Sequence, residues 1–375
     1  LARSQILLRM KKLTAPHLLL GRPVVEPDIR YATGFSAPDD VAVLLLPRKP
    51  VLVVSSMECG RARVQAPGCI VETPASLGVA PARRGQPAAW AVAAAERYAQ
   101  GGVQVDSSFP LGAARELEAH GIAVALAAES PVARRRVVKT PDEIAKIARV
   151  QKAARAAMRA VGKAIREAEA DPRGRLVWHG RLLTSEAARA IVRDAVLKHD
   201  CIDEETIIAG GAQAADPHER GHGPLMSGDW IVCDIFPRSL ETGYWGDMTR
   251  TFMHGRPSPW HAALHRAVLA AQRDALASVR HGADGAAIHD AVRRSFDAVG
   301  FPTGTDNNGL PFGFIHGTGH GVGLEIHEEP RLSPKGGRLA ENMVVTVEPG
   351  LYYPGRGGVR IEDLVVVGRD GPRVL

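Results

Sequence analysis

Four acidic residues lie within apolar, strand-like segments, and this feature limits the possible folds more than any other in the sequence. They are Asp234, Asp247, Glu348 and Glu362. A buried carboxylate without a partner is unstable, because it must either find compensating positive charge or bind a proton. A fold that buries these strands therefore has to bring positive charge to all four acids.

Two sources of positive charge are available to the four acids. Arg250 and Arg360 lie close to them in sequence, and an ion pair with arginine would account for any one acid but poorly for four. Two divalent cations would balance all four charges. Carboxylate and imidazole ligands suit Mn²⁺, Co²⁺, Zn²⁺ or Fe²⁺, and His320 supplies the nitrogen from the small-residue loop Gly319-His-Gly-Val-Gly323. The sequence therefore predicts a site for two divalent metal ions.

The order of elements repeats within the second part of the chain. Each half has helices, a histidine-bearing loop and two strands that carry one acid each. The acids are 13 residues apart in the first half and 14 in the second. This period is too long for a solenoid, whose repeats span about 20–50 residues. Two similar halves that face each other would bring the four acids together, with His218 in the first loop and His316, His320 and His327 in the second.

A helix start marks the boundary between two expected domains. Thr140 is suited to the N-cap, Pro141 to the first helical position and Glu143 to a capping box. A chain of 375 residues also exceeds the usual size of one hydrophobic core. We therefore expect an α/β (α+β) protein, with a small α/β domain over residues 1–138 and a catalytic domain over residues 139–375.

Apolar periodicity and turn residues predict the elements of both domains. In the first, we expect strands at residues 41–46, 51–54, 103–105 and 122–125 and helices at residues 88–98 and 113–120. Residues 30–35 are predicted as a strand that leads into a turn. In the second, we expect helices from residue 141 and at residues 185–199, 259–280 and 285–299, and strands at residues 206–209, 228–236, 244–252, 343–348 and 359–367.

The charge and composition argue against several other classes of protein. The net charge of +6 comes from arginines scattered along the chain, which favours a solvated surface over nucleic-acid binding. No run approaches the ~18 apolar residues of a membrane helix, and no signal-like apolar stretch opens the sequence. Since Cys59, Cys69, Cys201 and Cys233 lack CxxC spacing, we expect reduced thiols in a cytoplasmic protein.

A site with two divalent ions indicates the hydrolysis of an amide bond. Such a pair of ions turns a bound water into a hydroxide nucleophile near neutral pH and polarises a carbonyl. An acid–base group must then protonate the leaving nitrogen. His327 and His218 are the free histidines nearest to the expected ligands.

Five short segments between residues 139 and 367 combine acids, histidines and glycines in a specific order. They are Gly246-Asp-Met-Thr-Arg-Thr-Phe252, Gly319-His-Gly-Val-Gly323, His327-Glu-Glu-Pro330, Val347-Glu-Pro-Gly-Leu-Tyr352 and Arg360-Ile-Glu-Asp363. This order resembles the pita-bread metallopeptidases (family M24), which include methionine aminopeptidase, aminopeptidase P and prolidase, the Xaa-Pro dipeptidase. The resemblance implies a catalytic domain of two pseudo-twofold αβ halves with a curved, mostly antiparallel sheet. Residues 30–35 resemble part of the smaller creatinase/prolidase-like domain that precedes it in the last two.

The resemblance also implies roles for the five ligand positions. Asp247 and Glu362 would bridge both metal ions. Asp234 would complete the shell of one ion, and His320 and Glu348 that of the other. Glu348 would also act as the proton shuttle beside the bridging water.

Further roles implied by the resemblance concern the substrate. His327 would steady the scissile carbonyl, and His316 would line the leaving-group side. Arg360 would bind a substrate carboxylate or orient its neighbouring metal ligand. His218 corresponds to a substrate-facing histidine of the family, and His222 is a rival for that position because it also lies in a Gly-His-Gly segment.

The expected activity is that of a dinuclear metal-dependent peptidase that cleaves dipeptides or short peptides at Xaa-Pro bonds through a metal-bridging hydroxide. The run Asp234-Ile-Phe-Pro-Arg238 departs from the family's Asp-x-Gly and leaves the strictness for proline open. The alternatives are an aminopeptidase P that acts on longer peptides, a dipeptidase of relaxed specificity, and a pita-bread binding module without activity. We expect a peptide substrate, two ions (Mn²⁺, Co²⁺ or Zn²⁺) and a homodimer, and neither nucleic acid nor membrane as a partner.

Overall fold

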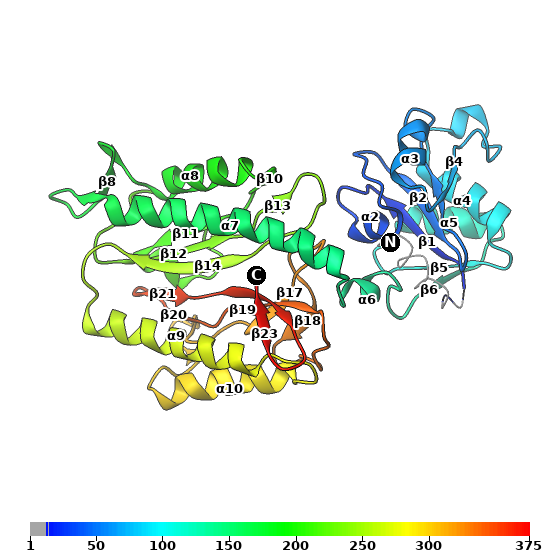
Figure 1. Cartoon of the computed structure of the whole chain (residues 1–375). Helices are drawn as coiled ribbons and strands as arrows, with labels where there is room; N and C mark the ends of the chain where they lie inside the picture. Colours follow the sequence, from blue (N-terminus) through cyan, green and yellow to red (C-terminus); the bar gives the residue numbers. More distant parts are fainter. Residues whose placement is uncertain (1–12, 14) are drawn as a thin grey trace. The chain divides into compact units, whose positions relative to one another are not determined.

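The structure is a computed structural model that describes residues 13 and 15–375. It divides into two compact units, of which the first ends at Arg136 and the second spans Val137–Leu375. Each unit is described by itself (Figure 1). The expectation about a signal-like stretch at the start of the sequence concerns residues that lie outside the described part.

The first unit is built on a mixed six-stranded sheet in the order β4-β3-β2-β1-β5-β6. Its strands are β1 His17–Gly21, β2 Val41–Leu45, β3 Val51–Val53, β4 Ile70–Glu72, β5 Val103–Val105 and β6 Val124–Leu126. Its helices are α2 Pro27–Thr33, α3 Cys59–Gln65, α4 Pro87–Tyr98, α5 Leu111–Ala119 and α6 Ala133–Arg136, with a 3₁₀ turn η2 at Pro81–Arg83. The four predicted strands and two predicted helices are confirmed.

The prediction for residues 30–35 is wrong, because most of this segment belongs to helix α2. Pro27 takes the first helical position, where its missing N–H is not needed. Gly34 ends the helix in a left-handed conformation with φ of 70°, which a glycine adopts at no steric cost. The apolar residues in this segment therefore follow helical spacing, and Ile29, Tyr31 and Ala32 are buried.

The second unit contains four long helices and two principal antiparallel sheets. The helices are α7 Pro141–Glu167, α8 Ser185–Leu197, α9 Pro259–Ser278 and α10 Gly285–Ala298. One sheet has the order β11-β12-β14 (Ile207–Gly210, Trp230–Ile235, Met248–Met253). The other has the order β18-β17-β19-β22-β23 (Glu328–Leu332, Gly319–Gly321, Val344–Val347, Asp363–Val367, Pro372–Val374). Helices α7 and α8 lie on one side of the strands and α9 and α10 on the other (Figure 1), so the two predicted αβ halves are confirmed.

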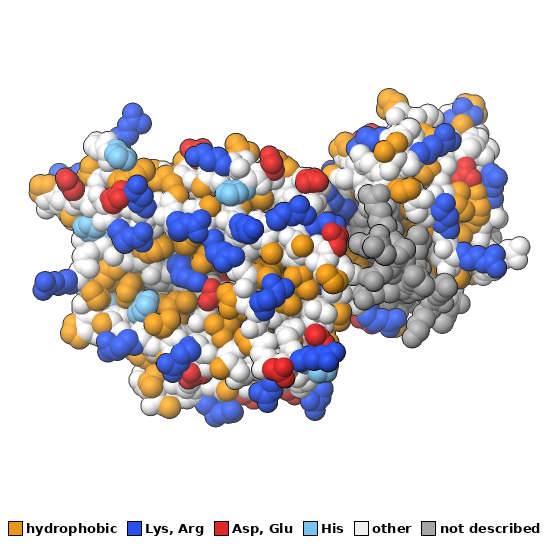
Figure 2. Space-filling model, in the orientation of Figure 1, with side chains coloured by type: hydrophobic (Ala, Val, Ile, Leu, Met, Phe, Trp, Pro, Cys, Tyr) orange, Lys and Arg blue, Asp and Glu red, His pale blue; other side chains and the backbone are white. Residues whose placement is uncertain are grey.

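Shorter elements complete the second unit. They are β7 Glu169–Ala170, β8 Leu176–Trp178, β9 Arg181–Leu182, β10 Cys201–Ile202, η3 Gly211–Ala215, β13 Arg238–Ser239, β15 Gly304–Thr305, β16 Pro311–Phe312, β20 Gly350–Tyr353 and β21 Gly357–Arg360. On the face shown in Figure 2, the Lys and Arg side chains of this unit are scattered among hydrophobic and acidic ones.

The acids predicted to lie inside strands mostly lie at strand ends. Asp234 is within β12, but Asp247 directly precedes β14 and Glu348 directly follows β19. The strand predicted over residues 359–367 is two strands, β21 and β22, and Glu362 lies in the break between them. Since a residue outside a ladder is not bound to the alternation of the pleat, these carboxylates are free to turn toward a common point.

The start of α7 forms as predicted. The Thr140 hydroxyl accepts a hydrogen bond from the Glu143 backbone N–H (3.3 Å), and the Glu143 carboxylate accepts one from the Thr140 N–H (2.8 Å). The helix then buries an apolar stripe that includes Ile147 and Val161.

We expect Thr140→Ala to lower the free energy of unfolding by about 1 kcal/mol, because one of the first N–H groups of α7 loses its acceptor. Denaturant unfolding monitored by circular dichroism measures this change. Thr140→Ser keeps the hydroxyl and should retain near-native stability. Equal losses in the two variants would show that the hydroxyl does not carry the effect.

Two further features bear on the sequence predictions. Within the described residues, no helix is long and apolar enough to cross a membrane. The four cysteines are free thiols. Burial raises the pKa of Cys69 to about 12 and that of Cys201 to about 11, so neither thiol is a nucleophile at neutral pH.

Candidate metal centre

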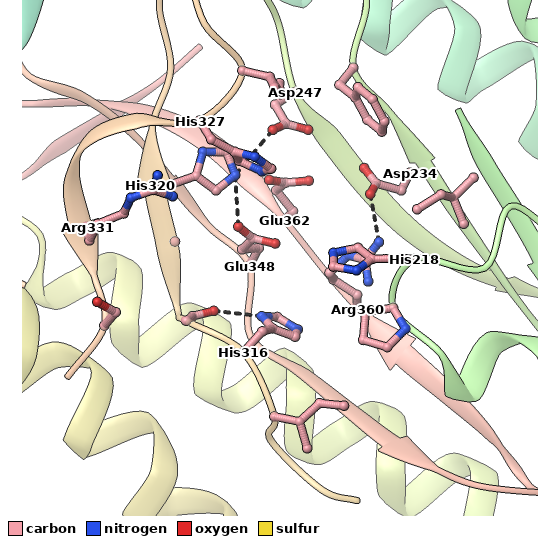
Figure 3. Close-up of a pocket in the computed structure, with 18 of the residues that line it drawn as sticks. His218, Asp234, Asp247, His316, His320, His327, Arg331, Glu348, Arg360 and Glu362 are labelled. Atoms are coloured by element: carbon pink, nitrogen blue, oxygen red, sulfur yellow. Dashed lines mark hydrogen bonds and ion pairs between the residues drawn. The ribbon is translucent and has the colours of Figure 1, made fainter. Parts of the chain in front are cut away.

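A cavity of about 690 Å³ in the second unit contains the residues that the sequence singled out. The predicted residues that line it are His218, Asp234, Asp247, His316, His320, His327, Glu348, Arg360 and Glu362. Their side chains point toward a common space between the two halves (Figure 3). The rival histidine, His222, is not among the described lining residues, and its side chain is 74% exposed.

The first half contributes two acids from neighbouring strands. Asp234 on β12 lies opposite Thr249 of β14, and Asp247 lies one residue before β14 begins. The backbone at Asp247 is held by Gln151 of α7, whose amide donates to the Asp247 carbonyl (2.7 Å) and accepts from its N–H (2.8 Å). The carboxylate of Asp247 is thus aimed by a buried amide on the long helix.

The second half contributes one histidine and two acids, which threonine hydroxyls orient. The His320 N–H donates to the Thr346 hydroxyl (3.0 Å), and that hydroxyl donates to Glu348 Oε1 (3.1 Å). The Thr249 hydroxyl donates to Glu362 Oε2 (2.7 Å), which links an acid of the second half to a strand of the first. These bonds hold the backbone at His320 and the carboxylates of Glu348 and Glu362 before any ligand binds.

Four of these side chains converge. Asp247, His320 and Glu362 each offer a ligand atom, and the three atoms lie within 4.8 Å of one another in a fully buried position. His320 Nε2 lies 3.1 Å from Glu348 Oε1 and 3.7 Å from Asp247 Oδ2. The predicted clustering of Asp247, His320, Glu348 and Glu362 is therefore present in the geometry.

Asp234 is held by an arginine instead. Arg360 Nη2 lies 2.7 Å from Asp234 Oδ2, and the other oxygen, Oδ1, is buried without a hydrogen-bond partner. The arginine alternative that the sequence left open thus applies to this one acid. The second arginine considered, Arg250, pairs with Asp363 (2.6 Å) outside the cluster.

The electrostatics of the cluster favour a bound cation. Burial, followed by the negative charges of neighbouring acids, raises the pKa of Asp247 and of Glu362 well above ordinary values. Burial would also raise the pKa of Glu348, but the hydrogen bond and charge of His320 hold it at about 2. Crowded carboxylates, one imidazole and the unpartnered Asp234 Oδ1 form a donor set that fits divalent metal ions. The residues present therefore fit a divalent metal ion, and the number of ions stays a prediction of the sequence.

His316 has a defined tautomer. Its Nδ1 lies 2.7 Å from the Gly317 carbonyl and must carry the proton, because a carbonyl only accepts. Its Nε2 therefore accepts from the Tyr352 hydroxyl (2.8 Å), which itself accepts from Arg360 Nη1 (2.7 Å). Both ring nitrogens of His316 are thus used within the protein, and the residue lines the cavity.

The other two histidines stand on opposite sides of the cavity. The ring of His327 meets that of His320 edge-on, with 4.3 Å between centroids. Burial, followed by the charge of His320, lowers the pKa of His327 to about 4, so this imidazole is neutral at pH 7. His218 lies on an exposed loop and lines the same cavity (Figure 3).

Strand β18 forms part of the cavity wall. Alternate residues of this strand face the cavity, and Glu329 and Arg331 line it while Glu328 and Leu332 are buried on the other side. Lys335 lines the same wall farther along the chain. Further apolar lining comes from Ile207, Phe236, Ile315 and Ile326.

Sequence reasoning missed four residues that orient the cluster: Gln151, Thr249, Thr346 and Tyr352. Thr249 and Tyr352 lie inside motifs that were recognised only for their acids. Gln151 carried a usable signal, because it is a polar residue between the apolar positions of the α7 stripe.

Comparisons with known proteins agree with this geometry. The model of metallopeptidase family M24 matches residues 145–369. The chain is 34% identical over 245 residues to a Xaa-Pro dipeptidase of Pyrococcus furiosus, a match covering 64% of this chain and 63% of that protein. It is 32% identical to a Xaa-Pro dipeptidase of Pyrococcus horikoshii over 72% of each chain.

Solved structures with the same fold cover nearly the whole chain. The prolidase from Pyrococcus horikoshii OT3 superposes with a TM-score of 0.81 at 24% identity, over 99% of this chain and 97% of that one. The dipeptidase PepE from Mycobacterium ulcerans superposes with a TM-score of 0.76 at 28% identity, over 99% and 94%. The predicted pita-bread fold with a smaller N-terminal domain is therefore confirmed.

Proposed function

Because this chain belongs to metallopeptidase family M24, we propose that it hydrolyses dipeptides, with a preference for Xaa-Pro, using two divalent ions. The observation that carries the proposal is the convergence of Asp247, His320 and Glu362, with Glu348 3.1 Å from His320, at one end of a cavity large enough for a dipeptide. The preference for proline rests on similarity to proteins named Xaa-Pro dipeptidase.

Five residues would hold the ions: Asp234, Asp247, His320, Glu348 and Glu362. When bound, two divalent ions supply a nucleophilic water at neutral pH and polarise the scissile carbonyl. Asp247 and Glu362, which come from different halves, are the acids whose charges most need neutralising, because burial and the negative charges of neighbouring acids raise the pKa of each. Glu362 is further anchored by Thr249 (2.7 Å).

Two other side chains would move or stabilise charge. Glu348 would keep one carboxylate oxygen free to accept a proton from the attacking water and return it to the leaving nitrogen. His327 is neutral and can donate a hydrogen bond to the carbonyl oxygen of the substrate. His218 would contact the substrate from the opposite wall, and His316 would border the leaving group.

The charges along the cavity favour a dipeptide over a longer peptide. Arg331 and Lys335 line the cavity and would attract the free carboxylate of a dipeptide. Arg360 is engaged with Asp234 and Tyr352, so it would orient ligands and not bind the substrate carboxylate. Phe236 lines the cavity wall and stands two residues after Asp234, at the glycine position of the family's Asp-x-Gly. This departure is the feature that favours a less strict preference for proline.

The test is metal removal followed by a peptide panel. Protein stripped with a chelator should not cleave Ala-Pro, and added Mn²⁺, Co²⁺ or Zn²⁺ should restore cleavage. Ala-Pro should be cleaved faster than Ala-Ala and faster than Ala-Pro-Ala. A faster tripeptide would indicate an aminopeptidase P, and equal rates for both dipeptides a relaxed dipeptidase. A protein that binds none of these ions and cleaves none of these peptides would refute the proposal.

We also propose a homodimer, for which light scattering should give twice the chain mass of 40.0 kDa.

A further inference from the structure

A buried ion pair lies behind the wall of the cavity. Lys139 is 2% exposed and Glu328 is 8% exposed, and the Lys139 ammonium contacts Glu328 Oε1. Neither residue is among those that line the cavity. Buried charges are costly to desolvate and such pairs often add little net stability, so net stability alone does not account for this pair.

The lysine is anchored on a rigid element. It directly precedes Thr140, the N-cap of α7. Its backbone N–H donates to the Asn342 carbonyl (3.0 Å), and the preceding residue, Val138, bridges to Met343 just before β19. The ammonium group is therefore held in place by the start of the long helix and by the strand that leads to Glu348.

Glu328 lies in the β17–β18 hairpin, which carries His320 and His327. Glu328 begins β18, directly follows His327 and lies opposite Gly321 of β17. A Cβ atom at Gly323 would lie only 2.4 Å from Glu328 Oε1, so the turn between the strands closes directly over this carboxylate. The turn connects His320 to His327, whose rings are in contact.

The hairpin needs such an anchor because its ladder is irregular. The register between β17 and β18 shifts between His320 and Gly321, so at the metal-facing histidine itself the pairing is interrupted. A local break in the ladder leaves backbone groups unpaired and changes the direction of the side chains beside it, so that direction depends on other contacts.

We infer that Lys139 and Glu328 are positioning residues, which fix the β17–β18 hairpin so that His320 faces Asp247 and Glu348 and His327 lies beside it. The inference rests on the proposed metal site, because positioning matters only if His320 binds an ion. It assigns Lys139 a role at a centre whose cavity it does not touch.

The test compares Lys139→Met with Lys146→Met in the full chain. Lys146 lies on the same helix and pairs with Asp142 (2.6 Å), but its pair is partly exposed and lies outside the hairpin. Co²⁺ alone is the probe, with affinity measured by calorimetry and ligand geometry by visible absorption. We expect Lys139→Met to bind Co²⁺ about 10–100-fold more weakly, with an altered spectrum, and Lys146→Met to match the wild type.

Two more variants separate positioning from general destabilisation. Glu328→Gln keeps the shape of the side chain and removes its charge, and it should alter the Co²⁺ spectrum in the same direction even if Lys139→Met does not fold. Val192→Ala weakens the core under α8 and should leave the spectrum unchanged. The inference is overturned if the Lys139 and Glu328 variants that fold keep the wild-type spectrum, or if Val192→Ala reproduces their change.

The same experiment distinguishes this inference from the proposed function. If the wild type binds Co²⁺ but cleaves no dipeptide, the proposed activity fails while the spectra still decide the role of Lys139. With an active wild type, we expect Lys139→Met to lower kcat more than it raises KM, since the substrate wall is intact. If the wild type binds no Co²⁺, both proposals fall.

Discussion

Asp247→Asn is expected to lower kcat/KM for Ala-Pro by at least ~10³-fold, which corresponds to about 4 kcal/mol of transition-state stabilisation. The substitution keeps the shape of the side chain and the backbone bonds to Gln151. It removes one carboxylate charge from the group that includes His320 and Glu362. Asp297→Asn, the same change on the exposed surface of α10, should keep activity near the native level. Near-native rates in Asp247→Asn would contradict the two-ion model.

The same substitution should have the opposite effect on the stability of metal-free protein. Burial and the neighbouring acids Glu362, Asp234 and Glu348 destabilise the Asp247 carboxylate, so replacing it with a neutral amide relieves repulsion. We expect metal-free Asp247→Asn to melt at a higher temperature than metal-free wild type. Added Mn²⁺ should raise the melting temperature of the wild type much more than that of the variant. A lower melting temperature for the metal-free variant would show that the acids are not mutually repulsive.

The residue types at the centre could be predicted because their chemistry is unusual. Several carboxylates in apolar strands, together with a histidine among glycines, are unfavourable in a folded protein unless cations bind them, so Asp234, Asp247, His320, Glu348 and Glu362 could be named from sequence. What the sequence could not give is how each is held. The pairing of Arg360 with Asp234 depends on two strands that are far apart in the chain.

The errors in the predicted fold have local physical causes. The apolar run that ends at Val367 reads as one strand, but the chain breaks at Ile361 and Glu362, where the Glu362 N–H instead donates to the Thr249 carbonyl (3.1 Å). Only a partner strand distant in sequence makes this break favourable. Short segments such as residues 30–35 fail for another reason, because too few residues are present to separate helical from strand periodicity.

Gly319→Ala is expected to lower kcat/KM by more than ~10²-fold, since a shift of about 1 Å at a reacting group has an effect of this size. A Cβ atom at Gly319 would lie 2.0 Å from the Thr346 carbonyl oxygen, which belongs to the backbone of β19. The clash can be relieved only if β17 and β19 separate. Such a separation would displace His320, whose N–H is bonded to the Thr346 hydroxyl, and Glu348, which follows β19.

Gly317→Ala is the matched control for this prediction, because it makes the same change two residues earlier in the chain. A Cβ atom at Gly317 would lie 3.3 Å from the Leu332 carbonyl oxygen and 3.4 Å from Ser333 Cβ, and small adjustments can accommodate both contacts. Neither glycine has a positive φ, so the two variants differ in close contact and not in backbone conformation. We expect Gly317→Ala to lower kcat/KM by less than about tenfold. Such a loss corresponds to less than about 1.4 kcal/mol of transition-state stabilisation. Equal losses of activity in both variants would show that this segment requires flexible glycines. A loss confined to Gly319→Ala, together with weaker Co²⁺ binding, would show that strands β17 and β19 must approach closely behind His320.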